Sequence, residues 1–332
     1  MVGDLLLLSV GLVFLLGGGE ALVRGATAIA SATGVPHLVV GLTIVAFGTS
    51  APELAVNVWA AWRDSGALSF GNIFGSNMAN IGLVLGVAGL LRPLRIQSVI
   101  IFREIPMMMV ATAAAVILSL DLIADISRNE FSRTDGLLLL LLFCVFLYYT
   151  VGDLARQRSE PGAITLSVGD ELASVGLFRS VLIMLAGLGA LLAGAEFTVD
   201  AALSLALAMG MPEAIIGLTL VAIGTSLPEL VTAVIATLRG HIDLAVGNVV
   251  GSNIFNILLV GGITATIRPI PVPPLGFVDL AMTVLLSLLL WFMATTRRRR
   301  IVRVEAVVLI SIYVGYLAWR MLTSPNALHF AN

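Results

Sequence analysis

The sequence predicts an all-α integral membrane protein of ten transmembrane helices, arranged as two five-helix repeats of inverted topology with broken helices at the midplane. Three observations predict it: apolar residues make up 59% of the 332 residues, charged residues make up 11%, and a long stretch of one half of the chain recurs in the other. Soluble domains carry roughly 25% charged residues, so this composition, with a mean hydropathy of +1.06, places the chain in a membrane.

Ten hydrophobic segments are long enough to cross a hydrocarbon core of roughly 30 Å as helices. They are 4–31, 38–62, 67–91, 99–119, 134–152, 176–207, 213–238, 242–267, 275–295 and 302–321. Asp4 stands where a signal peptide would be positively charged, so 4–31 is expected to remain as the first helix. Residues 153–175 are rich in charge, Gly, Pro and Ser, which predicts a cytoplasmic linker between repeats 1–152 and 176–332. Within the fourth span, Met107–Met109 is expected to face lipid or to fill packing gaps.

The chain contains one long motif twice. It reads GLTIVAFGTSAPEL from Gly41 and GLTLVAIGTSLPEL from Gly217. Segment 36–93 aligns with 212–269 without a gap, at 28 identities in 58 positions, which marks an internal duplication. Five spans in each repeat is an odd number. The second repeat therefore enters the membrane from the opposite side, which gives the halves inverted topology.

Arginine placement assigns the two sides of the membrane. All 18 basic residues are arginines. The loops of one side carry Arg92, Arg95, Arg156, Arg158, Arg179, Arg239, Arg297, Arg298, Arg299, Arg300 and Arg303, and those of the other carry Arg63, Arg128, Arg133, Arg268 and Arg320. The positive-inside bias makes the first side cytoplasmic and leaves both termini outside. The run 297–300 is interpreted as a topology anchor, with anionic-lipid binding as the alternative.

Two glutamates, Glu53 and Glu229, fall near the middle of apolar spans. An ionised carboxylate at that depth is costly unless something pairs with it. The basic candidate within a span is Arg24, which follows Glu20 by four positions and is expected to pair with it on one helix face. The two glutamates are therefore best explained as ligands of a mobile cation.

Oxygen atoms surround each glutamate in the sequence. Pro52 leaves the carbonyl of Gly48 without its helical partner, and Pro228 does the same to Gly224. The Thr and Ser of each GTS triplet lie four and three residues before the glutamate, on its face of the helix. The next spans, with GNIFGSNMANI and GNVVGSNIFNI, add further hydroxyls and amides, and their glycines 71, 75, 247 and 251 are expected to permit close helix approach. A set without His or Cys suits hard ions such as Ca²⁺ and Na⁺.

Paired GTSxPE and GNxxGSNxxN motifs in two five-helix halves resemble the repeats of the cation/Ca²⁺ exchanger superfamily, in particular its prokaryotic sodium/calcium exchanger branch. The resemblance implies that Ca²⁺ is held by Glu53, Glu229, Thr49 and Thr225, that Na⁺ is held by the carbonyls of Ala46 and Ala222 with Ser50, Ser226, Ser76 and Ser252, and that Asn80 and Asn256 complete the centre. Some family members carry an aspartate where this chain has Asn256, and in potassium-dependent relatives that aspartate is linked to K⁺ use. The substitution favours K⁺ independence here.

The resemblance implies a Na⁺/Ca²⁺ antiporter of a prokaryotic inner membrane that works by alternating access and extrudes Ca²⁺. H⁺/Ca²⁺ exchange is the nearest alternative, because a desolvated glutamate can carry a proton. A passive Ca²⁺ channel is a further alternative, although inverted halves with broken helices favour alternating access. The sequence argues against a membrane hydrolase, which needs a base beside its nucleophile, because the chain has no lysine and its three histidines fall in loops or the tail. The chain is expected not to be an enzyme, to need no cofactor or obligatory protein partner, and to bind no nucleic acid.

Overall fold

The computed structural model describes residues 2–120, 129–159, 176–208, 222–296 and 299–323, and it is helical apart from four strands of two residues each. The elements of the first half are α1 (Val2–Thr33), α2 (His37–Val40), η1 (Gly41–Val45), α3 (Ala46–Thr49), α4 (Ala51–Trp62), α5 (Gly66–Ala79), η2 (Asn80–Val84), α6 (Leu85–Leu91), β1 (Leu94–Arg95), η3 (Ile100–Glu104), α7 (Ile105–Leu118), β2 (Glu130–Phe131) and α8 (Arg133–Ser159). Those of the second half are α9 (Leu177–Ala208), α11 (Ala222–Thr225), α12 (Leu227–Leu238), α13 (Ile242–Ile254), η6 (Phe255–Val260), α14 (Gly261–Ile267), β3 (Ile270–Pro271), α15 (Gly276–Thr295), β4 (Arg300–Ile301) and α16 (Arg303–Thr323).

Eight helices among the described residues are long and apolar enough to cross a membrane, or nine when the bent segment His37–Thr49 plus Ala51–Trp62 counts as one span. They coincide with nine of the ten expected spans. The remaining one, 213–238, is described from residue 222 as α11 and α12, and its part before that lies outside the described residues. Within the expected linker, α8 continues to Ser159, and 160–175 lies outside the described residues, as do Arg128, Arg297 and Arg298.

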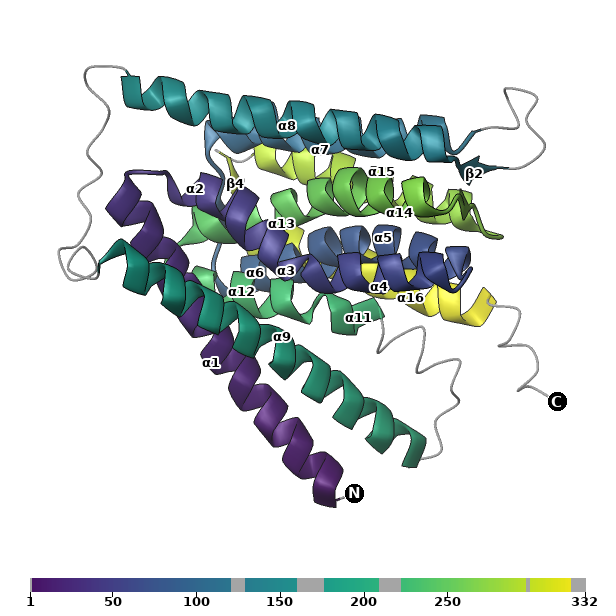
Figure 1. Cartoon of the computed structure of the whole chain (residues 1–332), viewed down its shortest axis with the longest axis horizontal. Helices are drawn as coiled ribbons and strands as arrows, with labels where there is room; N and C mark the ends of the chain where they lie inside the picture. The colour runs from purple at the N-terminus through teal and green to yellow at the C-terminus, as the bar shows by residue number, and fades with distance from the viewer. Residues whose placement is uncertain (1, 121–128, 160–175, 209–221, 297–298, 324–332) are drawn as a thin grey trace.

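Helices α1 and α9 lie side by side and cross the rest of the bundle obliquely (Figure 1). Their contact is built on glycines. A Cβ atom added at Gly18 would collide with the backbone N of Leu191, and one added at Gly187 would collide with the backbone N of Leu22. Only glycine permits this approach, so the two helices are held together backbone against backbone.

Helix α13 and its continuation occupy the centre of the molecule, with 94% of the apolar window of Ile242–Ile267 buried. Gly247 and Gly251 face the backbone of η1 and its neighbours, where an added Cβ would lie 2.7 Å from the oxygen of Leu38 and 2.5 Å from the oxygen of Leu42. This confirms the expected close approach for that half. For Gly71 and Gly75 no such contact is found, because no described atom lies within 4 Å of an added Cβ.

Two short antiparallel bridges, which the all-helical expectation did not include, join loops of the two halves. Leu94 pairs with Ile301 in one bridge, and Phe131 pairs with Ile270 in the other. The first bridge joins loops assigned to the cytoplasmic side, and the second joins loops assigned outside. Arg268 also pairs with Asp64, at 2.5 Å, on the side that the arginine placement assigns to the outside.

The prediction that Glu20 pairs with Arg24 is wrong. Glu20 pairs with Arg239 rather than with Arg24. Helix geometry permits a pair between Glu20 and the residue four positions later, but α1 packs along α12 and brings Glu20 to Arg239, which directly follows α12.

The methionines of α7 were expected to face lipid or to fill packing gaps, and Met108 is buried. It also accepts a hydrogen bond from Asn253, with Sδ 3.4 Å from Nδ2. This methionine therefore packs towards the polar centre of the bundle rather than towards lipid.

Candidate ion-binding site

Each GTS triplet lies at a break in a helix, as the prolines predict. Segment His37–Thr49 bends by 41° into Ala51–Trp62, and Pro52 occupies the first turn of α4. In the second half, Ser226 separates α11 from α12, and Pro228 occupies the first turn of α12. Proline has no N–H and its φ suits a helix start, so it ends one helix and begins the next. Each break places the glutamate that follows its proline in the buried centre of the bundle.

Glu53 and Glu229 are fully buried, and neither forms an ion pair with a described residue. Their environments differ. One carboxylate oxygen of Glu229 accepts hydrogen bonds from the hydroxyls of Ser50 and Ser252, each at 3.3 Å. Both carboxylate oxygens of Glu53 accept no hydrogen bond from the described residues. A buried polar atom without a partner is costly, so these oxygens are free to bind a cation.

The two halves contribute to one another's sites through a reciprocal pair of hydrogen bonds. The hydroxyl of Thr49 donates to Oδ1 of Asn248 at 3.2 Å, and the hydroxyl of Thr225 donates to Oδ1 of Asn72 at 3.3 Å. The two threonines occupy equivalent positions of the duplicated segment, and so do the two asparagines. The Thr49 hydroxyl also lies 3.4 Å from that of Ser252, and the residues of the two motifs therefore form one cluster.

Carbonyl and amide oxygens lie in the same cluster. The Ala46 carbonyl accepts the N–H of Ser50 at 3.0 Å and lies 3.4 Å from the Thr49 hydroxyl. A carbonyl oxygen has two lone pairs, so it can accept a hydrogen bond and still meet an ion. Asn80 donates to Oδ1 of Asn253 at 3.0 Å. The side-chain amide of Asn256 is buried without a described partner.

Three further predicted residues complete the set. The hydroxyls of Ser76 and Ser226 are both buried without a described hydrogen-bond partner. Ala222 lies in α11, which ends at the break before Glu229. No cluster of three or more His, Cys, Asp or Glu side chains occurs in the described part of the chain, so the donors here are two carboxylates among hydroxyl, amide and carbonyl oxygens. Such a set suits a hard cation.

The site contains polar residues that were not selected from the sequence. Asn72 and Asn248 accept the threonine hydroxyls, and Asn253 accepts from Asn80. Each lies in the GNxxGSN motif. A polar residue that recurs at the equivalent position of the other repeat, within an apolar span, is the signal that could have found it.

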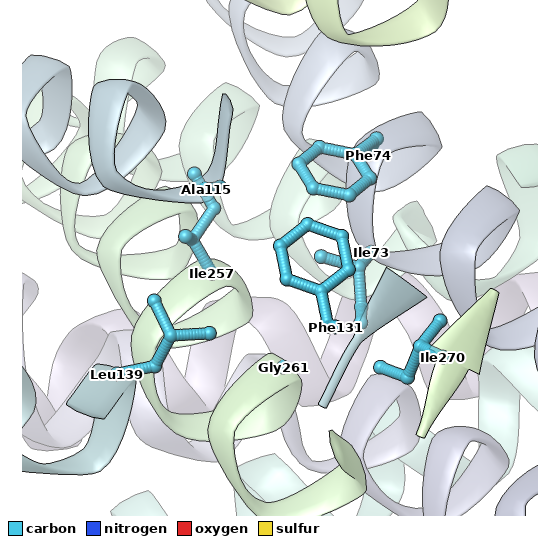
Figure 2. Close-up of a pocket in the computed structure, with 8 residues that line it drawn as sticks. All are labelled: Ile73, Phe74, Ala115, Phe131, Leu139, Ile257, Gly261 and Ile270. Carbon is cyan, nitrogen blue, oxygen red and sulfur yellow. The ribbon is translucent and has the colours of Figure 1, made fainter. Parts of the chain in front are cut away.

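An apolar cavity nearby is not part of this site. Figure 2 shows its lining of aliphatic and aromatic side chains, including Ile73, Phe131 and Ile270. With no charged group and no hydroxyl among the residues drawn, it offers a cation nothing to replace its water.

Comparison with known proteins identifies the family. A family model described as sodium/calcium exchanger protein matches residues 4–152 and 179–322. The chain belongs to this family. It is therefore a cation/Ca²⁺ antiporter and a multi-pass membrane transporter, as the motifs predicted.

Relatives of this sodium/calcium exchanger family member match over nearly its whole length. It is 37% identical to the putative antiporter CaxA of Alkalimonas amylolytica, over 92% of this chain and 95% of that one. It is 31% identical to the sodium/calcium exchanger MaX1 of Methanosarcina acetivorans, over 95% of this chain and 97% of that one. A structure of the sodium-calcium exchanger NCX_Mj soaked with Na⁺ and Sr²⁺ superposes with a TM-score of 0.80 at 30% identity, over 95% of this chain and 97% of that one.

Proposed function

We propose that this chain exchanges Na⁺ for Ca²⁺ by alternating access and extrudes Ca²⁺ on the inward Na⁺ gradient. The observation that carries the proposal is the pair of buried carboxylates, Glu53 and Glu229, one from each repeat, with no cationic partner among the described residues. A buried carboxylate is retained in a membrane where it pairs with something, and a transported cation is the partner that the oxygen cluster accommodates.

The donors divide by charge and position. Glu53 and Glu229 with the hydroxyls of Thr49 and Thr225 would hold Ca²⁺, which favours charged oxygen ligands. Na⁺ would be held by the carbonyls of Ala46 and Ala222 with the hydroxyls of Ser50, Ser226, Ser76 and Ser252. Asn80 and Asn256 would complete the centre. Because the centre has two formal negative charges, one Ca²⁺ or two Na⁺ neutralise it.

We propose further that the halves are repeats of opposite topology, 1–152 and 176–332, joined by a cytoplasmic linker, in a prokaryotic inner membrane with both termini outside. The reciprocal Thr49–Asn248 and Thr225–Asn72 hydrogen bonds support this arrangement, because a threonine of each repeat donates to the equivalent asparagine of the other. The two short bridges also support the assignment of sides, since each joins loops expected on the same side. Ca²⁺ and Na⁺ would act as substrates, without a cofactor or an obligatory protein partner.

H⁺/Ca²⁺ exchange is the second candidate, favoured by one observation. Both oxygens of Glu53 lack a described hydrogen-bond donor, so a proton could satisfy this carboxylate in the absence of metal. The abundance of neutral hydroxyl and carbonyl oxygens favours Na⁺ instead, because a proton needs none of them.

The test is Ca²⁺ uptake into sealed proteoliposomes preloaded with Na⁺, beside a matched set given only a pH gradient and a blank of Glu53→Gln. Uptake that requires internal Na⁺ and vanishes in the variant supports Na⁺/Ca²⁺ exchange. Uptake that follows the pH gradient and ignores Na⁺ moves the protein to proton coupling. Added K⁺ is expected to leave the rate unchanged, because Asn256 is uncharged.

A further inference from the structure

An ion pair joins the α1/α9 pair of helices to the rest of the bundle on the side assigned to the cytoplasm. Arg239, directly after α12, donates to both carboxylate oxygens of Glu20 on α1, at 2.5 and 3.1 Å. The contact is two-pronged, which fixes the relative position of the two groups better than a single bond does. Gly19 permits close packing of α1 on α12 beside this ion pair, because an added Cβ there would lie 2.7 Å from the side chain of Ile235.

Both residues of this ion pair recur in the other repeat. In the alignment of the two repeats, Glu196 on α9 is the counterpart of Glu20, and Arg63, directly after α4, is the counterpart of Arg239. The two counterparts make no ion pair with each other in this structure. Glu196 is exposed, and the Arg63 guanidinium lies over the ring of Trp59, 5.4 Å from its centre. The sequence is therefore symmetric at these four positions, while the structure is not.

The asymmetry would be reversed by a shift of α1 and α9 relative to α4 and α12. Helices α1 and α9 are locked together at glycines, so they shift as one body. When two inverted repeats exchange conformations, a contact that one repeat makes can be replaced by the equivalent contact of the other. A shift that separates Glu20 from Arg239 would then bring Glu196 to Arg63, at the opposite ends of the bundle.

We propose that Glu20–Arg239 and Glu196–Arg63 are alternative latches that position the α1/α9 pair in the two access states of the transporter. This inference rests on the proposed alternating access. The present structure has the first latch closed and the second open. Each latch is an exposed ion pair, which contributes modestly, so removal of one shifts the population of the two states by about two- to fivefold.

Cysteine cross-linking tests the latches. The lone native cysteine, Cys144, is first replaced by alanine. A Glu20→Cys/Arg239→Cys pair and a Glu196→Cys/Arg63→Cys pair are then each reconstituted in liposomes and treated with a short bifunctional thiol reagent. Both pairs are expected to cross-link, because both states are visited. Arg63→Gln added to the first pair is expected to raise its cross-linked fraction, and Arg239→Gln added to the second pair is expected to raise that of the second.

Matched controls are Arg24→Gln and Asp200→Asn, which remove charges one turn further along α1 and α9 at duplicated positions that differ in charge. Neither should change the cross-linked fractions. Absence of cross-linking between residues 63 and 196 in a protein that transports Ca²⁺ would overturn the latches and leave the proposed function intact. Reciprocal cross-linking in a protein without Na⁺-dependent uptake would refute Na⁺ coupling and support the latches.

Discussion

Gly251→Ala is expected to damage both stability and ion binding, because it pushes α13 away from the helix that holds the site. An added Cβ would lie 2.5 Å from the carbonyl oxygen of Leu42 and 2.8 Å from Cβ of Ala46, where ordinary contact begins at 3.4 Å. The backbones must therefore separate by about 0.9 Å at this point, from the difference between 3.4 and 2.5 Å. Overpacking of this kind costs about 1–3 kcal/mol, and the better helix propensity of alanine returns at most about 1 kcal/mol.

The same shift moves the Ala46 carbonyl and Thr49, because Ala46 is itself in the contact and Thr49 lies three residues further along the chain. A loss of about 1.4 kcal/mol in binding is a tenfold weaker affinity for Ca²⁺. Thermal unfolding in detergent and equilibrium Ca²⁺ binding measure the two effects. Gly189→Ala is the matched control, because no described atom lies within 4 Å of an added Cβ there. Equal melting temperatures and equal affinities for the two variants would refute the close approach of α13 to this helix.

Three further predictions concern the Glu229 hydroxyls, the ion pairs and His241. Ser252→Ala removes one of two hydroxyls bound to the Glu229 carboxylate and is expected to weaken ion binding about tenfold without loss of fold, by isothermal titration. Asp279→Asn breaks a mostly buried ion pair with Arg320 and should lower the free energy of unfolding by about 3 kcal/mol. Asp64→Asn breaks an exposed ion pair and should lower it by less than about 1 kcal/mol. Equal losses for the two variants in denaturant titrations would contradict this difference. Burial is the main cause that lowers the pKa of His241 below its usual 6.5. The unfolded chain therefore binds more protons than the folded chain in acid, and the free energy of unfolding should fall as the pH drops below 6.5. His241→Gln should weaken this pH dependence of the melting temperature.

The sequence predicts the parts of this fold that depend on local chemistry and on the duplication. Proline fixes where the broken helices restart, so the positions of both breaks follow from Pro52 and Pro228. The repeat supplies the matching elements of the second half, and apolar length supplies the spans. These are properties of a residue and its neighbours along the chain.

Contacts between distant segments could not be predicted in this way. Glu20 has Arg24 within reach on its own helix, and the packing of α1 on α12 decides in favour of Arg239. Met108 reaches Asn253 because α7 packs against α13. The duplicated glycines also differ, since Gly251 meets a backbone and Gly75 meets no described atom. Identical motifs do not dictate identical contacts when the two halves adopt different conformations.

Na⁺ and Ca²⁺ are expected to compete for one site built on Glu53 and Glu229. Equilibrium binding of Ca²⁺ to the purified protein, titrated with Na⁺ at fixed pH, tests it most directly. We predict that the apparent dissociation constant for Ca²⁺ rises more steeply than in proportion to the Na⁺ concentration, since more than one Na⁺ replaces each Ca²⁺. Glu53→Gln is expected to abolish Ca²⁺ binding. Ca²⁺ binding that is indifferent to Na⁺, or that persists in Glu53→Gln, would contradict it.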